Sequence, residues 1–171
     1  MLDFPEIFRL RQRFRGPTLR DVAGEVEAQL SKLALADRIR PRQSVAITAG
    51  SRGIANLPIV LKAIVEHLRR LDAQPLIVPA MGSHGGGTSS GQLKVLESLG
   101  VTESACGCPI VASMDTVEVC QAPEGFPVHF DRVAFEADHV MVCNRIKAHT
   151  RFTGDLQSGL MKMMLIGLGK H

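Results

Sequence analysis

The chain has 171 residues, of which 45% are hydrophobic and 22% charged, and its only aromatic side chains are seven phenylalanines. This length is sufficient for one domain with a substantial apolar core. The shortage of aromatic rings argues against a protein that stacks the bases of single-stranded nucleic acid. No stretch reaches the ~18 consecutive apolar residues of a membrane span, and Asp3 and Glu6 interrupt the start of the chain. We therefore predict a cytoplasmic protein without nucleic-acid or membrane partners.

The positive charge is unevenly distributed. Residues 1–42 hold nine Lys/Arg and six Asp/Glu, which accounts for the whole net charge of +3. A second basic region lies in residues 145–171, which contain five Lys/Arg and a single acidic residue, Asp155. This excess is explained either by a solvated face or by an anionic small ligand.

The four cysteines, Cys106, Cys108, Cys120 and Cys143, contain no C-x-x-C pair. In a cytosolic chain, reduced thiols are the expectation, with two of them in the core.

The first 41 residues are predicted to form an N-terminal helical segment. Apolar residues recur at helical intervals over residues 19–36, and Thr18 and Asp21 have the spacing of a capping box. Pro41 ends this segment.

From residue 42 the pattern changes to apolar strands that alternate with glycine-rich loops and helices. The expected strands are 44–49, 74–80 and 139–144; the expected helices are 57–71, with Asn56 as N-cap, 91–99, stopped by Gly100, and about 158–168. Residues 116–121 and 127–131 are expected to pair as an antiparallel ribbon. We predict an α/β, Rossmann-like domain over residues 42–171, with a parallel sheet covered by helices on both faces.

The loops after the three strands should meet at one edge of the sheet, where ligands bind in such folds. The first loop carries Arg52, which suits a carboxylate or phosphate but is equally explained as a solvated loop tip. The second and third carry His84 and His149, whose imidazoles titrate near neutrality and suit acid/base work. Further on, Lys162 is either a lysine snorkelling from a helix end or a nucleophile, and His171 is either an incidental terminus or a metal ligand.

Four segments carry a resemblance to a known family: GSRGIAN, PAMGSHGG, VCNRIKAHT and SGLMKMMLIGLGKH. Together they resemble the N-terminal domain of the lactate racemase family, whose enzymes depend on a nickel-pincer nucleotide. The resemblance implies that Lys162 tethers this cofactor and that His171 binds the nickel. It also implies that His84 and His149 are the paired acid/base groups and that Arg52 helps to hold the substrate.

Two departures qualify the resemblance. Lactate racemases proper carry an acidic residue three positions before the arginine, where this chain has Ala49, so a substrate other than lactate is expected. Family members are also about twice this length, so we expect a fragment that lacks the C-terminal domain closing the cleft.

The resemblance implies a racemase or epimerase of a 2-hydroxy acid. Paired histidines fit this function, because inverting one carbon needs an acid/base group on each side. The rival hypotheses are a non-catalytic module that binds an anionic metabolite and a cofactor-handling protein without turnover.

Overall fold

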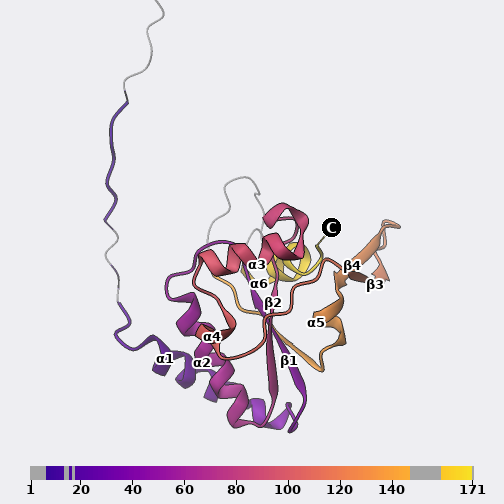
Figure 1. Ribbon diagram of the computed structural model, residues 1–171, viewed down its shortest axis with the longest axis horizontal. Helices are drawn as coiled ribbons and strands as arrows, with labels where there is room; N and C mark the ends of the chain where they lie inside the picture. The colour runs from indigo at the N-terminus through magenta and orange to yellow at the C-terminus, as the bar shows by residue number, and fades with distance from the viewer. Residues whose placement is uncertain (1–6, 14–15, 17, 147–158, 171) are drawn as a thin grey trace, which may run out of the picture.

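A parallel sheet forms the centre of the molecule (Figure 1). The structure is a computed structural model that describes residues 7–13, 16, 18–146 and 159–170. The strands are β1 (Ser44–Ala49), β2 (Gln74–Pro79) and β5 (His139–Met141), arranged in the order β2-β1-β5. β1 pairs in parallel with both neighbours, so the carboxyl ends of the three strands lie at the same edge. The predicted α/β fold with a parallel sheet is confirmed.

Helices cover both faces of this sheet. They are α1 (Val22–Leu30), α2 (Leu57–Arg70), α3 (Ser89–Ser98), α4 (Glu103–Cys106), α5 (Arg132–Glu136) and α6 (Gly159–Lys162). The short helical turns are η1 (Ser31–Leu33), η2 (Leu35–Asp37), η3 (Gly85–Gly87) and the π-helix η4 (Met163–Gly167). In Figure 1, α2 and α4 lie on one side of the strands and α5 lies on the other.

The alternation of side chains along β1 explains why the strand is mostly apolar. Val45 and Ile47 enter a core shared with α2, whereas Ala46 enters a core shared with α5 and the π-helix. Successive strand residues point to opposite faces, so a strand covered on both faces has no solvated positions to fill with polar residues. Thr48 is the exception; its Oγ1 accepts a hydrogen bond from Cys143 N at 2.9 Å, just beyond β5.

The predicted antiparallel ribbon is confirmed as β3 (Thr116–Gln121) paired with β4 (Pro127–Asp131). It projects from the body beside α5 (Figure 1). A fourth extended segment was not expected from the sequence. Residue 77 donates from its backbone N–H to Pro109 O and accepts from Val111 N, both at 2.9 Å, so this segment runs beside β2.

Several predicted boundaries need correction. The helix expected over residues 19–36 is α1 alone, and its N-cap is Asp21, whose Oδ1 accepts from Gly24 N at 2.8 Å. Ala34 has a left-handed backbone (φ 48°), which breaks the rest of the segment into η1 and η2. The third strand ends at Met141, three residues before its expected end.

The other helices lie close to their predicted positions. α2 matches the helix expected at 57–71, although Asn56 occupies the N-cap position without a side-chain hydrogen bond. α3 begins two residues earlier than expected because Thr88 caps it, and Gly100 follows its end with a φ of 76°. The last expected helix is divided into α6 and the π-helix. α4 and α5 are short helices that the sequence did not predict.

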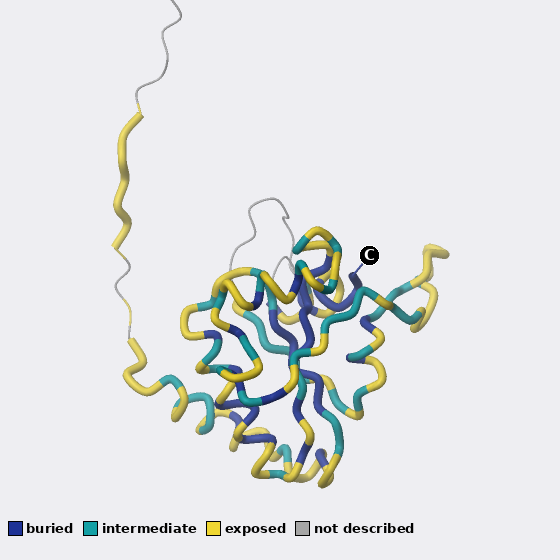
Figure 2. The backbone as a smooth tube through the Cα atoms, in the orientation of Figure 1, coloured by how far each residue is buried: buried dark blue, intermediate teal, exposed yellow. Residues whose placement is uncertain are grey.

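The N-terminal residues 7–13 extend away from the body and are exposed (Figures 1 and 2). α1 packs against α2, where His67 Nδ1 lies 3.0 Å from each Glu27 carboxylate oxygen and Arg70 also pairs with Glu27. The division at residue 41 into a helical segment and a Rossmann-like domain stays a prediction. No helix in the described part of the chain is long and apolar enough to cross a membrane.

Candidate active site

A cavity of about 290 Å³ lies at the edge of the sheet where the strands end. Three separate parts of the chain line it: the loop after β1, the loop after β2, and the segment from β5 to the π-helix. The lining residues that carry polar side chains are Ser51, Arg52, His84, Asn144, Arg145 and Lys162.

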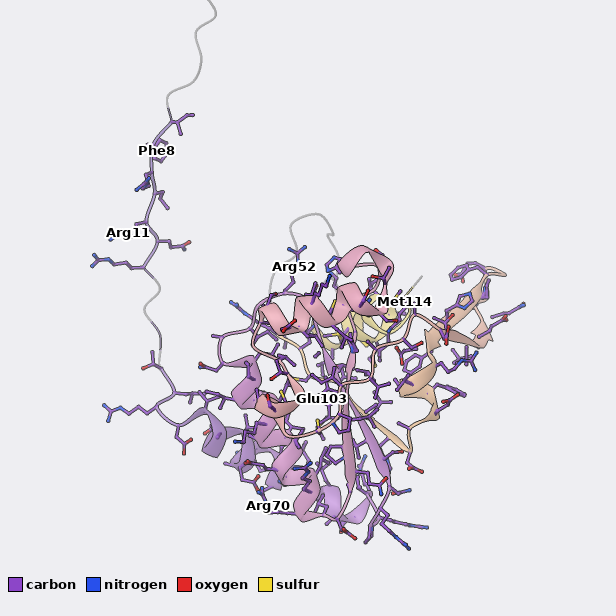
Figure 3. All side chains as sticks on the ribbon, viewed as in Figure 1. Phe8, Arg11, Arg52, Arg70, Glu103 and Met114 are labelled. Carbon is purple, nitrogen blue, oxygen red and sulfur yellow. The ribbon has the colours of Figure 1, made fainter. Side chains whose placement is uncertain are left out.

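Arg52 enters the cavity from the loop that joins β1 to α2. Its side chain lies at the end of the molecule where this loop, α3 and the π-helix gather (Figure 3). Arg52 is exposed and forms no ion pair with another described residue. Its fork of N–H donors is therefore available to a carboxylate or phosphate.

His84 enters from the glycine-rich loop after β2. Its Nδ1 shares a hydrogen bond with Ser51 Oγ, which joins the loops after β1 and β2. Gln92 of α3 supports the backbone of the loop that carries His84. Its side chain is fully buried, and its Nε2 donates to Gly82 O at 2.8 Å. The imidazole is thus a surface group on a supported loop.

Lys162 stands at the end of α6, directly before the π-helix, and is half-buried. π-helical turns are rare and occur often at functional sites. Gly82 N donates to Gly167 O at 3.2 Å, which docks the His84 loop on this π-helix. Gly82 has a φ of 58°, and a Cβ there would lie 2.9 Å from the carbonyl oxygen of Ile166, so only glycine fits the contact.

Asn144 connects β5 to α6. Its Nδ2 donates to Gly159 O at 2.9 Å, and its Oδ1 accepts from the N–H of Arg145 at 2.8 Å. The side chain therefore joins the two ends of the segment 145–159. Asn144 was not predicted as a site residue, although this residue directly follows an apolar strand. Arg145 was predicted only as part of the basic region.

A comparison with protein families matches residues 17–171 to the lactate racemase N-terminal domain. The chain belongs to the lactate racemase family. A comparison with curated proteins finds no match.

Of the site residues predicted from the lactate racemase resemblance, three line the same cavity: Arg52, His84 and Lys162. His149 and His171 lie outside the described residues, so the pairing of His149 with His84 and the role of His171 stay predictions. Lys170, the residue before His171, is anchored in the core, where its Nζ lies 2.7 Å from Asp131 Oδ2 and donates to Ser113 O.

The charges around the cavity have one sign. Its described lining carries two guanidiniums and one amine, from Arg52, Arg145 and Lys162, and no carboxylate. This arrangement attracts an anion. The described residues contain no group of three or more His, Cys, Asp or Glu that could hold a metal ion. The described lining therefore suits an organic anion.

The cysteines take no part in this lining. All four are free, and Cys106 and Cys108 are buried in the core, as predicted. Burial raises the pKa of the Cys108 thiol to about 11 and raises that of Cys106 as well. Both thiols stay protonated and unreactive near neutral pH.

Proposed function

We propose that this chain forms one wall of the active site of a 2-hydroxy-acid racemase or epimerase. The observation that carries the proposal is the cavity that brings Arg52, His84 and Lys162 together with no acidic residue among its described lining. Membership of the lactate racemase family supports the reaction class. The substrate class follows from the charge, because a 2-hydroxy acid carries a carboxylate beside the carbon that is inverted.

In this proposal Arg52 binds the substrate carboxylate. A guanidinium offers two parallel N–H donors, which fix the orientation of a carboxylate as well as its position. That orientation matters because the hydroxyl and the hydrogen on the neighbouring carbon must face different groups. Ala49, fully buried at the end of β1, replaces the acidic residue of lactate racemases proper, which supports a substrate other than lactate.

His84 takes the proton of the substrate hydroxyl. An imidazole exchanges a proton readily near neutral pH, and His84 is exposed to the cavity from a supported loop. A second imidazole, proposed to be His149, serves the opposite face of the carbon, so that either enantiomer can be used.

The residues present also suit the family's nickel-pincer nucleotide. Lys162 is proposed to form the covalent tether, Arg145 to meet the phosphate, and His171 to bind the nickel. When bound, this group supplies the acceptor for the hydrogen that leaves the carbon as hydride. Lys162 is half-buried and lines the cavity, where its side chain can meet a bound group.

A second domain is proposed to close the cavity. Apolar side chains remain exposed beside it, among them Ile146, Leu165 and Ile166, which are 82%, 63% and 52% exposed. Covering them would also exclude water from the reacting carbon. By the same reasoning, this chain without a second domain is expected to fold but not to racemise a substrate.

The experiment assays the protein with its closing domain, made in a host that synthesises the cofactor, by chiral chromatography of several 2-hydroxy acids. His84→Ala should lower turnover by about 100-fold or more, as expected for loss of an acid/base group. His139→Ala is the matched control, because His139 lies at the start of β5, away from the cavity, where its Nε2 meets Gln43 Oε1 at 2.9 Å.

Unchanged turnover in His84→Ala would contradict the assigned role. The rival function, a binding module for an anionic metabolite, is favoured by the same cationic lining. Cofactor-loaded protein that binds the acids through Arg52 without interconverting them would support this rival.

A further inference from the structure

We propose that Ser51 is a positioning residue for His84: its hydroxyl holds Nδ1 of the imidazole, so that Nε2 is the nitrogen presented to the ligand. The inference rests on the proposed function only where it concerns turnover. The contact itself is a property of this chain. Ser51 was not among the site residues predicted from the sequence.

The two residues reach each other across adjacent strands. Ser51 lies two residues after the end of β1, and His84 lies five residues after the end of β2. Their side chains share the Oγ–Nδ1 hydrogen bond, and both residues line the cavity. A contact between residues so far apart in sequence exists only because the strands are parallel neighbours in register.

The backbone around this contact is held independently of the two side chains. Ala80 N donates to Ala49 O at 2.8 Å, which continues the pairing of β1 and β2 to the edge of the cavity. His84 N donates to Met81 O at 3.2 Å and closes the next turn. With the strand ends paired and the turn at His84 closed in this way, the hydrogen bond sets the plane of the imidazole ring.

The chemistry of the cavity decides which atom donates. The charged groups that line the cavity with His84 are Arg52, Arg145 and Lys162, and all three are donors only. A neutral imidazole beside such donors, and beside a substrate hydroxyl, is best presented with its lone pair on Nε2. The proton then lies on Nδ1 and is donated to Ser51 Oγ.

A hydroxyl suits this position better than a carboxylate. When Nε2 takes a proton, Nδ1 keeps its own, and Ser51 continues to accept the same hydrogen bond without rearrangement. A carboxylate at this place would stabilise the imidazolium strongly and hinder release of the proton. A neutral acceptor orients the ring while leaving both charge states accessible.

A nucleophilic role for Ser51 is the competing interpretation, because serine and histidine also form hydrolytic pairs. Such sites have a third group that orients the histidine and donors that stabilise an oxyanion. In the described part of the chain, Ser51 is the one side chain shown to bind the His84 ring, and no carboxylate lines the cavity. The geometry therefore favours positioning.

The test measures the tautomer of His84 in this chain by long-range proton–nitrogen NMR, with His84→Gln to assign the signals. In the parent chain the neutral ring should be protonated mainly on Nδ1. In Ser51→Ala it should revert to the Nε2-protonated form that predominates in water.

Two further variants complete the test. Ser51→Thr keeps a hydroxyl and should restore the parent tautomer. Ser83→Ala removes an exposed hydroxyl next to His84 that does not line the cavity, and it should change nothing. A tautomer that is the same in Ser51→Ala as in the parent would overturn the proposal, as would labelling of Ser51 by a fluorophosphonate.

In the loaded protein, Ser51→Ala should lower kcat by about tenfold with little change in KM, because the acid/base group is misoriented while Arg52 still binds the substrate. Failure of racemisation in the parent protein would contradict the proposed function and leave the NMR result to decide on Ser51.

Discussion

The two faces of the sheet are built in different ways. The face under α2 is closed by a large apolar core, to which Leu61, Val65 and Leu68 contribute fully buried side chains. The face under α5 and the π-helix has a smaller core, and the π-helix keeps exposed apolar side chains at Met164, Leu165 and Ile166. The first face stabilises the fold, whereas the second shapes the cavity.

The second face depends on polar contacts where the first depends on apolar ones. Its C-terminal segment is held by the ion pair between Lys170 and Asp131, whose side chains are 0% and 1% exposed. Asp131 also caps α5, because its Oδ1 accepts from Ala134 N at 2.7 Å. The same carboxylate thus joins α5 to the end of the described chain.

Removing this ion pair should have the largest effect on stability. Lys170→Met leaves the buried carboxylate of Asp131 without its partner, and a broken buried pair costs about 3–5 kcal/mol. Urea unfolding measures the loss. Lys62→Met is the control, since Lys62 is 57% exposed in a surface pair 3.9 Å from Glu66 and should change stability by less than about 0.5 kcal/mol. Equal effects of the two variants would contradict the account of the second face.

Truncation of one leucine on each face tests the comparison directly. Leu68→Ala empties a fully buried position of α2 and should cost about 2–5 kcal/mol. Leu165→Ala changes a side chain of the π-helix that is 63% exposed and should cost less than about 0.5 kcal/mol. A larger loss of stability in Leu165→Ala than in Leu68→Ala, measured by urea unfolding, would contradict the claim that the face under α2 stabilises the fold.

The smallest expected effect concerns pH and the contact between α1 and α2. Hydrogen bonding to His67, together with Arg70, holds the pKa of Glu27 below its ordinary value of 4.5. A carboxyl group with a lowered pKa in the folded state contributes stability above the unfolded pKa and loses it as the pH falls through the folded value.

Glu27→Gln should therefore be less stable than the parent near neutrality, and the difference should shrink below about pH 4.5. Melting temperatures measured from roughly pH 3 to 7 test this expectation. A difference that is constant across the range would show that Glu27 contributes by packing alone.

The sequence predicted those parts of the fold that depend on local pattern. Residues 44–49 are mostly apolar and 57–71 are amphipathic, and both elements occur within a residue of their expected bounds. The start of α1 was wrong because Thr18 and Asp21 both satisfy the capping pattern, and the pattern alone does not choose between them. The π-helix was not predicted, because an apolar run that ends in glycine is typical of an ordinary α-helix.

The candidate site was predicted to a different extent. Arg52, His84 and Lys162 were predicted as site residues from their chemistry and from the family resemblance, and all three line one cavity, while their roles stay predictions. Ser51 and Asn144 were not identified, because their importance lies in contacts with residues 33 and 15 positions away. Such contacts depend on strand register and loop closure, which spacing along the chain does not express.

The central claim is that Lys162 belongs to a cofactor-dependent site, and peptide mapping by mass spectrometry tests it most directly. Protein made in a host that synthesises the nickel-pincer nucleotide should carry the modification on the peptide containing Lys162. The modification should be absent in Lys162→Ala and retained in Lys62→Ala, in which an exposed lysine of α2 is changed. A catalytically active preparation with an unmodified Lys162 would contradict the account.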